Sequence, residues 1–125
     1  MAFVEVNLNP CGRDVGDCVI RALCLVTGQD WESVYTQLAY QGLLMCDMMN
    51  ANEVWGAYLR GMGYVRKTIP DYCPDCYTIR EFAEDHPHGV YVVATGSHVV
   101  PVIFGDYYDT SDSGSSIPTY YMERR

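Results

Sequence analysis

Hydrophobic residues in the first half of the chain recur at spacings of three and four positions, a pattern typical of amphipathic helices. The clearest run extends from Val19 to Val26, and Gly28 follows it as a glycine follows the C-terminus of many helices. This pattern predicts a short, mostly buried helix from about Asp17 to Thr27.

Two more helices are predicted downstream. Asp30 is a suitable N-cap for the first of them, and Gly42 is predicted to end it. The second opens with a capping-box pattern at Asn50–Glu53 and ends at Gly63. Residues 43–49 fit either a continuation of the first helix or a packed loop. The side chains predicted to face inward are Trp31, Val34, Tyr35 and Leu38 in the first helix, and Val54, Trp55, Tyr58, Leu59 and Met62 in the second.

The second half of the chain changes to strand patterns. One segment alternates apolar and basic residues, and two later segments are rich in valine and isoleucine, as neighbouring buried strands are. The predicted strands span residues 64–69, 90–95, 99–104, 107–110 and 119–122.

Other local signals complete the predicted fold. Thr78 and Glu81 form a capping box that predicts a short helix between the strands, and residues 1–15 are predicted to form an irregular or extended arm. We therefore expect an α+β fold, one domain over residues 1–125, with N-terminal helices packed on a C-terminal, mostly antiparallel sheet.

Charge and composition narrow the function classes. Sixteen acidic and eight basic residues give a formal charge of −8, which argues against nucleic-acid or acidic-membrane partners. No apolar run has the length of a membrane span, and the N-terminus lacks a signal-peptide pattern. Six cysteines without a secretory signal favour reduced thiols, so we expect a cytoplasmic protein.

Cys18 occupies the first turn of the first predicted helix. A helix N-terminus carries unpaired N–H groups and partial positive charge, and both favour the nucleophilic thiolate. The same N–H groups suit an oxyanion that forms beside the sulfur. Free cysteine is also a common small core residue, and Cys24 on the same helix is predicted to be of that structural kind.

His98 and Asp109 are predicted to meet across a hairpin. If Phe104 and Gly105 form a two-residue turn, His98 and Asp109 are diagonal neighbours on one face, roughly 7–8 Å apart at the backbone. A turn one residue later keeps the same face but places Asp109 too far along the strand. Asp112 falls on the opposite face in either register, so Asp109 is the predicted partner of His98.

The order Cys, His, Asp is that of a thiol acyl-transfer triad, in which histidine takes the thiol proton and aspartate orients the ring. The motifs around these residues resemble papain-like cysteine peptidases, most closely small papain-like proteins of bacteriophages and gut Firmicutes. The resemblance covers roughly residues 7 to 122 and implies a nucleophile helix followed by histidine and aspartate on antiparallel strands. Its motifs are Gly16–Leu23, Ser97–Ile103 and Tyr107–Thr110.

The chain departs from this family at one position. Papain-like peptidases usually carry a glutamine six residues before the cysteine, where it donates to the oxyanion, and this chain has Gly12 there. Asn9 is the predicted replacement because its amide is chemically closest to glutamine. Arg13 and backbone N–H groups are the alternatives.

A metal site is the competing interpretation of a different segment. Cys73 and Cys76 have the spacing of two zinc ligands, and His86 and His88 follow. No second Cys-x-x-Cys pair closes the site, and the histidines flank a proline turn, so loop thiols are favoured. We expect no metal and no cofactor.

The sequence thus predicts a cysteine peptidase or amidase that acts on a peptide or protein through a thioester acyl-enzyme. Its predicted catalytic residues are Cys18, His98 and Asp109, with Asn9 at the oxyanion. The resemblance places it in a bacterial or phage-infected host cytosol. A non-catalytic papain-like fold that serves as a phage-encoded protein-binding module is the alternative. Neither the substrate nor the oligomeric state follows from the sequence.

Overall fold

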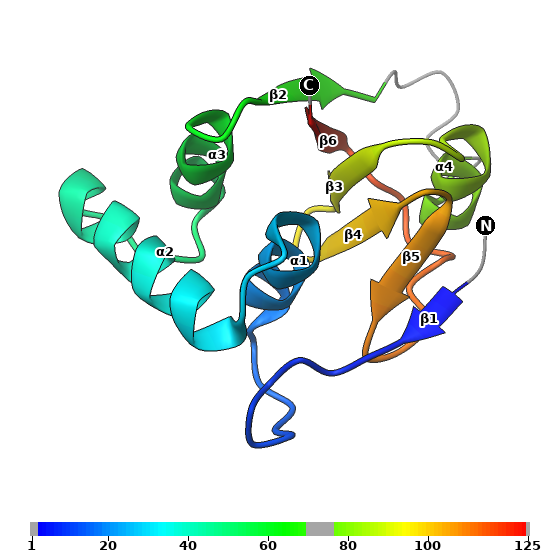
Figure 1. Ribbon diagram of the computed structural model, residues 1–125. Helices are drawn as coiled ribbons and strands as arrows, with labels where there is room; N and C mark the ends of the chain where they lie inside the picture. Colours follow the sequence, from blue (N-terminus) through cyan, green and yellow to red (C-terminus); the bar gives the residue numbers. More distant parts are fainter. Residues whose placement is uncertain (1–2, 70–76, 125) are drawn as a thin grey trace.

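The computed structural model describes residues 3–69 and 77–124 of the chain, and these residues form an α+β fold (Figure 1). The helices are α1 (Cys18–Thr27), α2 (Trp31–Met45), α3 (Asn52–Arg60) and α4 (Ile79–Asp85). The strands are β1 (Phe3–Glu5), β2 (Tyr64–Thr68), β3 (Val90–Ala94), β4 (Val99–Ile103), β5 (Asp106–Asp109) and β6 (Tyr120–Arg124). The α+β prediction is confirmed.

The described strands form one mixed sheet in the order β1-β5-β4-β3-β6-β2. Every neighbouring pair is antiparallel except β1 and β5, which run parallel with Phe3 opposite Tyr107. The N-terminal arm therefore begins as an edge strand. Strands β3 and β4 lie in the middle of the sheet, and the turn that joins them carries His98.

Helices cover both faces of the sheet. Val90, Val92 and Ala94 of β3 pack with α1, α2 and α3, whereas Tyr91 and Val93 pack with α4 and β5 on the other face. Successive strand residues point to opposite faces, so a strand covered on both sides is hydrophobic throughout. This explains the unbroken apolar run of β3, in which every residue is buried.

Three predicted helix signals are confirmed. Gly28 ends α1 in the left-handed conformation with φ 73°, which glycine adopts without a steric penalty. The Asp30 side chain accepts a hydrogen bond from the Ser33 N–H at the start of α2. Thr78 and Glu81 form a reciprocal capping box at the start of α4.

Gly42 does not end α2, contrary to the prediction. The helix continues to Met45, and Cys46 ends it in the left-handed conformation with φ 54°. A Cβ at Gly42 would lie 2.8 Å from the Asp47 carbonyl oxygen and 3.2 Å from the Met49 nitrogen. The glycine therefore permits close approach of the returning chain, and residues 43–45 continue the helix.

The predicted start and end of the third helix are also wrong. Ala51 is its N-cap, and no side chain caps it, so Asn50–Glu53 do not form a capping box. The helix ends at Arg60, before Gly63, and Met62 is exposed beyond it. Tyr35, predicted to face the core from α2, is exposed and stacks on Trp31.

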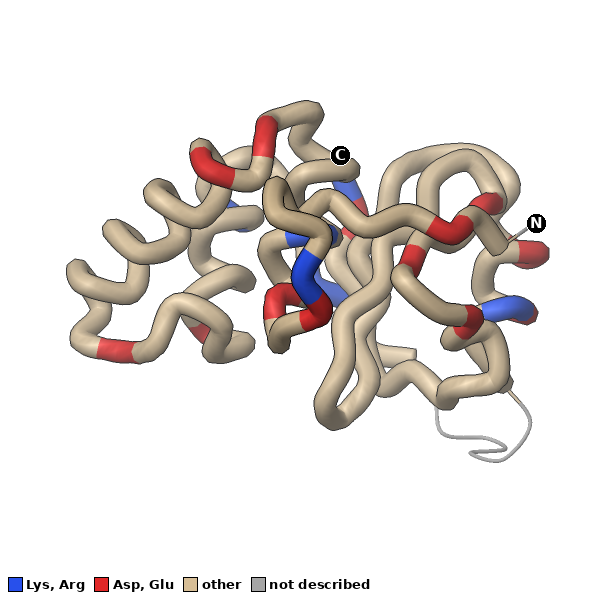
Figure 2. Tube along the Cα trace, turned by 90° about the horizontal axis from the view of Figure 1, so that it is seen from below, with Lys and Arg blue, Asp and Glu red and all other residues tan. Residues whose placement is uncertain are grey.

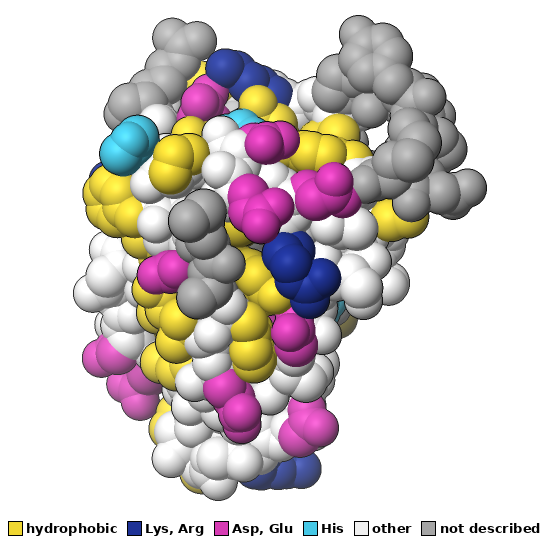
Figure 3. Space-filling model, turned by 90° about the vertical axis from the view of Figure 1, so that its right-hand side faces the viewer, with side chains coloured by type: hydrophobic (Ala, Val, Ile, Leu, Met, Phe, Trp, Pro, Cys, Tyr) yellow, Lys and Arg dark blue, Asp and Glu magenta, His cyan; other side chains and the backbone are white. Residues whose placement is uncertain are grey.

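Acidic residues are distributed along the whole chain, and basic residues are fewer (Figure 2). Asp and Glu also outnumber Lys and Arg on the face shown in Figure 3. Among the described residues, no helix combines the length and apolarity that crossing a bilayer requires.

Candidate functional site

Cys18 is the first residue of α1, as predicted, and it is half-buried. Asp17 is the N-cap of this helix, but its side chain makes no capping hydrogen bond. The backbone N–H groups of the first turn are therefore not capped by the side chain of the N-cap residue. Because α1 packs on β4 and β3, Cys18 lies next to the β3–β4 turn.

His98 is held by that turn. Its backbone N–H donates to Thr95 Oγ1 at 3.0 Å, and its carbonyl accepts from the Thr95 N–H at 2.8 Å. These two hydrogen bonds close the turn immediately before β4 begins at Val99. The imidazole is about one-third exposed, with 32% of its side-chain surface accessible.

Asp109, the last residue of β5, accepts a hydrogen bond from His98. The His98 Nε2 lies 2.6 Å from Asp109 Oδ2. The β4–β5 hairpin has Ile103 opposite Asp106, and its two-residue turn has φ 48° at Phe104 and φ 83° at Gly105. The first of the two predicted registers is therefore confirmed, as is the predicted partner of His98.

Asp112 is engaged elsewhere. Its Oδ1 accepts from the Tyr107 hydroxyl at 2.7 Å, and its Oδ2 lies 3.6 Å from the Arg80 guanidinium. It makes no contact with His98, as the alternation of strand side chains predicts.

The Cys18 thiol and the His98 imidazole lie close enough for each to shift the pKa of the other. Since Nε2 is occupied by Asp109, Nδ1 is the ring nitrogen left for the sulfur. Burial raises the pKa of Cys18, but the hydrogen bonds from His98 and the Val99 N–H, with the charges of His98 and Arg21, outweigh it. The pKa of the Cys18 thiol is consequently below its usual value.

The pKa values of His98 and Asp109 are shifted in the directions that favour their charged forms. Hydrogen bonds to Asp109 and then to Cys18 raise the pKa of His98 to about 9, against the effect of burial. Burial raises the pKa of Asp109, but hydrogen bonding, chiefly from His98, lowers it to about 2. These three directions favour the thiolate, the imidazolium and the carboxylate relative to the isolated groups.

Arg21 donates a hydrogen bond to Asp109 Oδ1, the carboxylate oxygen that His98 does not contact. Its Nη1 donates to Asp109 Oδ1 at 3.3 Å, and its Nε donates to Asp17 Oδ1 at 2.8 Å. The Trp31 indole N–H donates to Asp17 Oδ2 at 3.0 Å. A continuous chain of hydrogen bonds therefore runs from Trp31 through both carboxylates to His98.

This chain of polar groups was not predicted from the sequence. Asp17 and Asp109 are each 5% exposed, and burying a charge requires a partner. The available signal was a carboxylate and a guanidinium four residues apart on an otherwise apolar helix, since residues at this spacing share one face. That signal pairs Asp17 with Arg21 but does not reveal Asp109.

A cavity of about 390 Å³ opens beside the sulfur and the imidazole. Its walls come from the start of α1, the start of α3 and the β3–β4 turn. The lining residues are Cys18, Val19, Asn50, Ala51, Asn52, Glu53, Thr95, Gly96, Ser97, His98 and Val99. The segment 50–53 was not predicted to belong to the site.

Asn9, the predicted oxyanion donor, is outside the set of lining residues. Its amide nitrogen donates to Asp17 Oδ2 at 3.4 Å, and its Oδ1 accepts from the N–H groups of Cys11 and Arg13. In the cavity itself, Asn52 is a side-chain amide whose Oδ1 accepts from the Trp55 indole at 3.1 Å, and whose Nδ2 donates to no group among residues 3–69 and 77–124.

The remaining thiol and imidazole groups differ from this pair. Cys24 is buried, as predicted, and burial followed by the charges of Asp30 and Asp17 raises its pKa to about 11. His86 stacks on Phe82 with ring centroids 3.8 Å apart. Cys73 and Cys76 are outside the described residues. Within residues 3–69 and 77–124, no cluster of metal-ligating side chains is present.

Comparison of the chain with protein-family models, with curated proteins and with solved structures gives no match. The arrangement of Cys18, His98 and Asp109 is therefore what indicates a function for this protein.

Proposed function

We propose that the protein is a papain-like thiol hydrolase that cleaves a peptide or other amide bond through a thioester. The observation that carries this proposal is the pairing of one imidazole with both other groups. His98 bonds Asp109 at 2.6 Å through Nε2 and lowers the pKa of the Cys18 thiol at the start of α1. A papain-like arrangement of helix and sheet is part of the same proposal.

In the first half of the reaction, the Cys18 thiolate attacks the carbonyl carbon of the amide. The carbonyl oxygen becomes an oxyanion, which the N–H groups at the start of α1 and the amide of Asn52 are placed to receive. His98 gives its Nδ1 proton to the amide nitrogen, the carbon–nitrogen bond breaks, and the amine leaves. The acyl group stays on the sulfur as a thioester.

In the second half, neutral His98 takes a proton from water, and the resulting hydroxide attacks the thioester carbon. The carbon–sulfur bond breaks, the carboxylic acid leaves, and Cys18 returns as a thiolate beside an imidazolium. Asp109 holds Nε2 protonated throughout, which keeps Nδ1 directed at the sulfur. No cofactor is required for this cycle.

The test of this function is the alkylation rate of Cys18 by iodoacetamide against pH, followed by mass spectrometry of the intact and digested protein. In the parent protein Cys18 should react at mildly acidic pH, because its pKa is lowered. His98→Ala should slow this reaction at least roughly tenfold, since it removes a hydrogen bond and a charge from the thiolate. Asp109→Asn should have a smaller effect.

Cys24 is the internal control of that experiment. Its raised pKa and burial should keep it unreactive in every variant over the same pH range. Identical Cys18 profiles in the parent and both variants would show that Cys18 is a structural cysteine and would refute the proposal.

A papain-like binding module without turnover is the second candidate function. It is favoured by the position of the usual oxyanion glutamine, where Gly12 has no side chain and φ 66°. Under this alternative Cys18 would still alkylate fast, but the protein would release no amine from a peptide library. The proposed substrate is a peptide or protein, and the proposed setting is a bacterial or phage-infected cytosol.

A further inference from the structure

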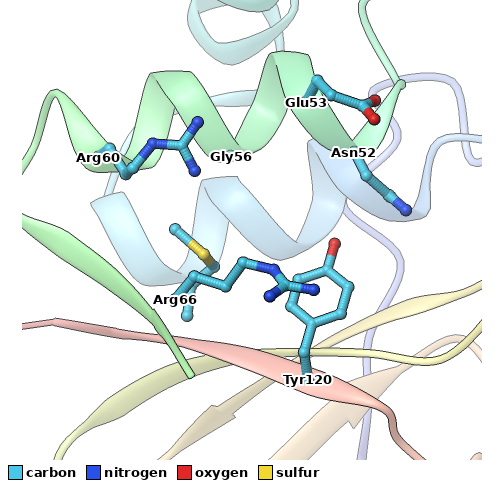
Figure 4. A pocket seen from close by; sticks show the side chains of 7 residues that line it. Asn52, Glu53, Gly56, Arg60, Arg66 and Tyr120 are labelled. Atoms are coloured by element: carbon cyan, nitrogen blue, oxygen red, sulfur yellow. The ribbon is translucent and has the colours of Figure 1, made fainter. Parts of the chain in front are cut away.

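A second cavity, of about 370 Å³, adjoins the one beside Cys18 and His98 (Figure 4). Asn52 and Glu53 line both cavities, so the second continues the first along α3 toward the outer strands β6 and β2. The other lining residues are Gly56, Arg60, Arg66, Tyr120 and Met122.

Two guanidinium groups reach this cavity from different elements. Arg60, the last residue of α3, folds back over Gly56, where a Cβ would lie 3.4 Å from its Nη1. Arg66 extends from β2 across the face of Tyr120, with its guanidinium carbon 4.2 Å from the ring centroid. Figure 4 shows both guanidinium groups directed into the space between α3 and the sheet.

Neither guanidinium has an acidic partner among the described residues, although the chain has a formal charge of −8. Three of the other basic side chains form ion pairs: Arg21 with Asp17 and Asp109, Lys67 with Glu123, and Arg80 with Asp112. Arg13 and Arg124 form none with a described residue. Two unpaired cations that face one cavity in an acidic protein form a local positive site. Such a site suits an anionic ligand.

We propose that this cavity is a carboxylate-binding subsite that selects substrates with an acidic group some residues away from the cleaved amide, an inference that rests on the proposed function. A guanidinium pairs with a carboxylate through two parallel hydrogen bonds. The cation–π contact with Tyr120 holds the Arg66 plane in a fixed orientation.

Glu53 determines which part of the two joined cavities suits the acidic group of the substrate. It lines both cavities and, within the described residues, makes no ion pair with either arginine. Its own charge disfavours a second carboxylate at the junction, beside the reacting amide. The acidic group is therefore expected beyond Glu53, and a neutral or basic group beside it. The carboxylate belongs either to an acidic side chain or to the C-terminus of a peptide.

The first experiment measures binding without catalysis. Cys18→Ala protein is titrated with N-acetyl-glutamate methylamide, N-acetyl-alanine and N-acetyl-glutamine methylamide, and the arginine Nε–H resonances are followed by NMR. The two carboxylates should shift the Arg60 and Arg66 signals saturably, and the neutral amide should not. A preference for the first or second probe tells a side-chain from a terminal carboxylate.

Arg80 and Lys67 supply the controls. Arg80 is an exposed arginine in α4, and its signal should not move with any probe. Arg60→Gln and Arg66→Gln should weaken binding of the carboxylates about tenfold, the size of a charge-assisted contact. Lys67→Gln removes the same charge from the opposite face of β2 and should leave binding unchanged. Equal shifts at Arg80, or equal losses with Lys67→Gln, would overturn the proposal.

The second experiment uses active protein and peptidyl vinyl sulfones that differ only by glutamate or glutamine at successive positions. At one position glutamate should label Cys18 about tenfold faster than glutamine, and Arg60→Gln should abolish that preference. Labelling without a preference at any position would overturn the subsite but leave the proposed function intact. Absence of labelling by every probe would refute the hydrolase, while the NMR titration still decides the subsite.

Discussion

At the scale of single residues, Arg21 connects the start of α1 to the proposed catalytic pair. It donates to Asp17 at 2.8 Å and to Asp109 at 3.3 Å, and its side chain is only 11% exposed. Asp109 Oδ1 also accepts from the Thr110 N–H at 2.7 Å. With His98 on the other oxygen, the carboxylate is fixed on both sides, which makes Arg21 a positioning residue for His98.

Arg21→Met tests this role. The variant leaves two buried carboxylates without their shared cation, so we expect it to lose about 3 kcal/mol of unfolding free energy. If Arg21 had only a structural role, this loss of unfolding free energy would be the only effect of the substitution. As a positioning residue, Arg21 should also set the pH profile of Cys18 alkylation, which should move to higher pH because the guanidinium charge itself stabilises the thiolate.

Arg80→Met is the matched control. Arg80 is half-exposed and forms a 3.6 Å ion pair with Asp112, so its loss should cost much less unfolding free energy than the loss of Arg21. Urea unfolding measures the first effect, and mass spectrometry of the alkylated folded protein measures the second. An Arg21→Met protein with the parent's pH profile would contradict the positioning role.

The residues that could be predicted from the sequence are those that local periodicity relates. Strand alternation and a two-residue turn bring His98 and Asp109 to one face, so their contact could be predicted from the number of residues between them. Trp31 and Asn9 reach Asp17 from other segments, and only the tertiary packing of α1, α2 and the N-terminal arm brings them together. No spacing in the sequence encodes those contacts.

At the scale of elements, glycines show where sequence patterns become ambiguous. Gly28 and Gly42 each follow an apolar helical run, and both were predicted to end a helix. Gly28 does so with a positive φ, whereas Gly42 is inside α2 and lets the returning chain approach. A helix stop and a close contact require the same residue type, and the contact depends on a segment whose path is not local.

Gly42→Ala separates the two roles. Alanine favours helix by about 1 kcal/mol over glycine, so a glycine without a contact would be improved by the change. At Gly42 the added Cβ would meet backbone atoms at 2.8 and 3.2 Å, which move only if the segment after α2 moves. We expect a net loss of about 1–3 kcal/mol.

Gly56→Ala is the control for that substitution. It makes the same change inside α3, where the nearest atom is the flexible Arg60 guanidinium at 3.4 Å. We expect the unfolding free energy to rise or stay unchanged. Chemical unfolding of both variants checks the pair, and a stabilised Gly42→Ala protein would refute the close-approach role.

At the scale of the whole molecule, the α+β composition followed from the patterns, but the arrangement of layers did not. The apolar runs of β3 and β4 indicated burial without saying what covers each face. One core cluster lies between the sheet and helices α1 to α3, and the other lies between the sheet and α4. His98 directly precedes β4, a central strand of this sheet. The parallel pairing of β1 with β5 also depends on a contact between chain segments far apart in sequence.

The ion pair at the site predicts how the stability of the whole protein depends on pH. In the unfolded chain the cysteine pKa is about 8.5 and the histidine pKa about 6.5. Between these values the unfolded chain holds a neutral thiol and a neutral imidazole, and the ion pair that the proposed function requires in the folded protein is a thiolate beside an imidazolium. Both states then bind the same number of protons, so this pair contributes no slope to the unfolding free energy.

Cys18→Ala makes the numbers of protons bound by the folded and unfolded states unequal. Its folded state keeps the hydrogen bond from His98 to Asp109, the largest cause of the raised His98 pKa, while the unfolded histidine is neutral above about pH 6.5. The folded state then binds more protons, so this stability is fully present below about pH 6.5 and is lost as pH rises through the raised pKa of folded His98, which lies lower in the variant than in the parent because the Cys18 contribution is gone. The slope should reach at most about 1.4 kcal/mol per pH unit.

Urea unfolding of the parent and of Cys18→Ala from pH 6.5 to 8.5 tests this, because all other titrating groups are common to both proteins. The variant should lose stability relative to the parent as pH rises. Adding Asp109→Asn should abolish the difference in slope, since it removes the hydrogen bond that keeps His98 protonated. Parallel pH profiles in the parent and Cys18→Ala would mean that the folded protein holds a neutral thiol and imidazole, and that the ion pair does not form.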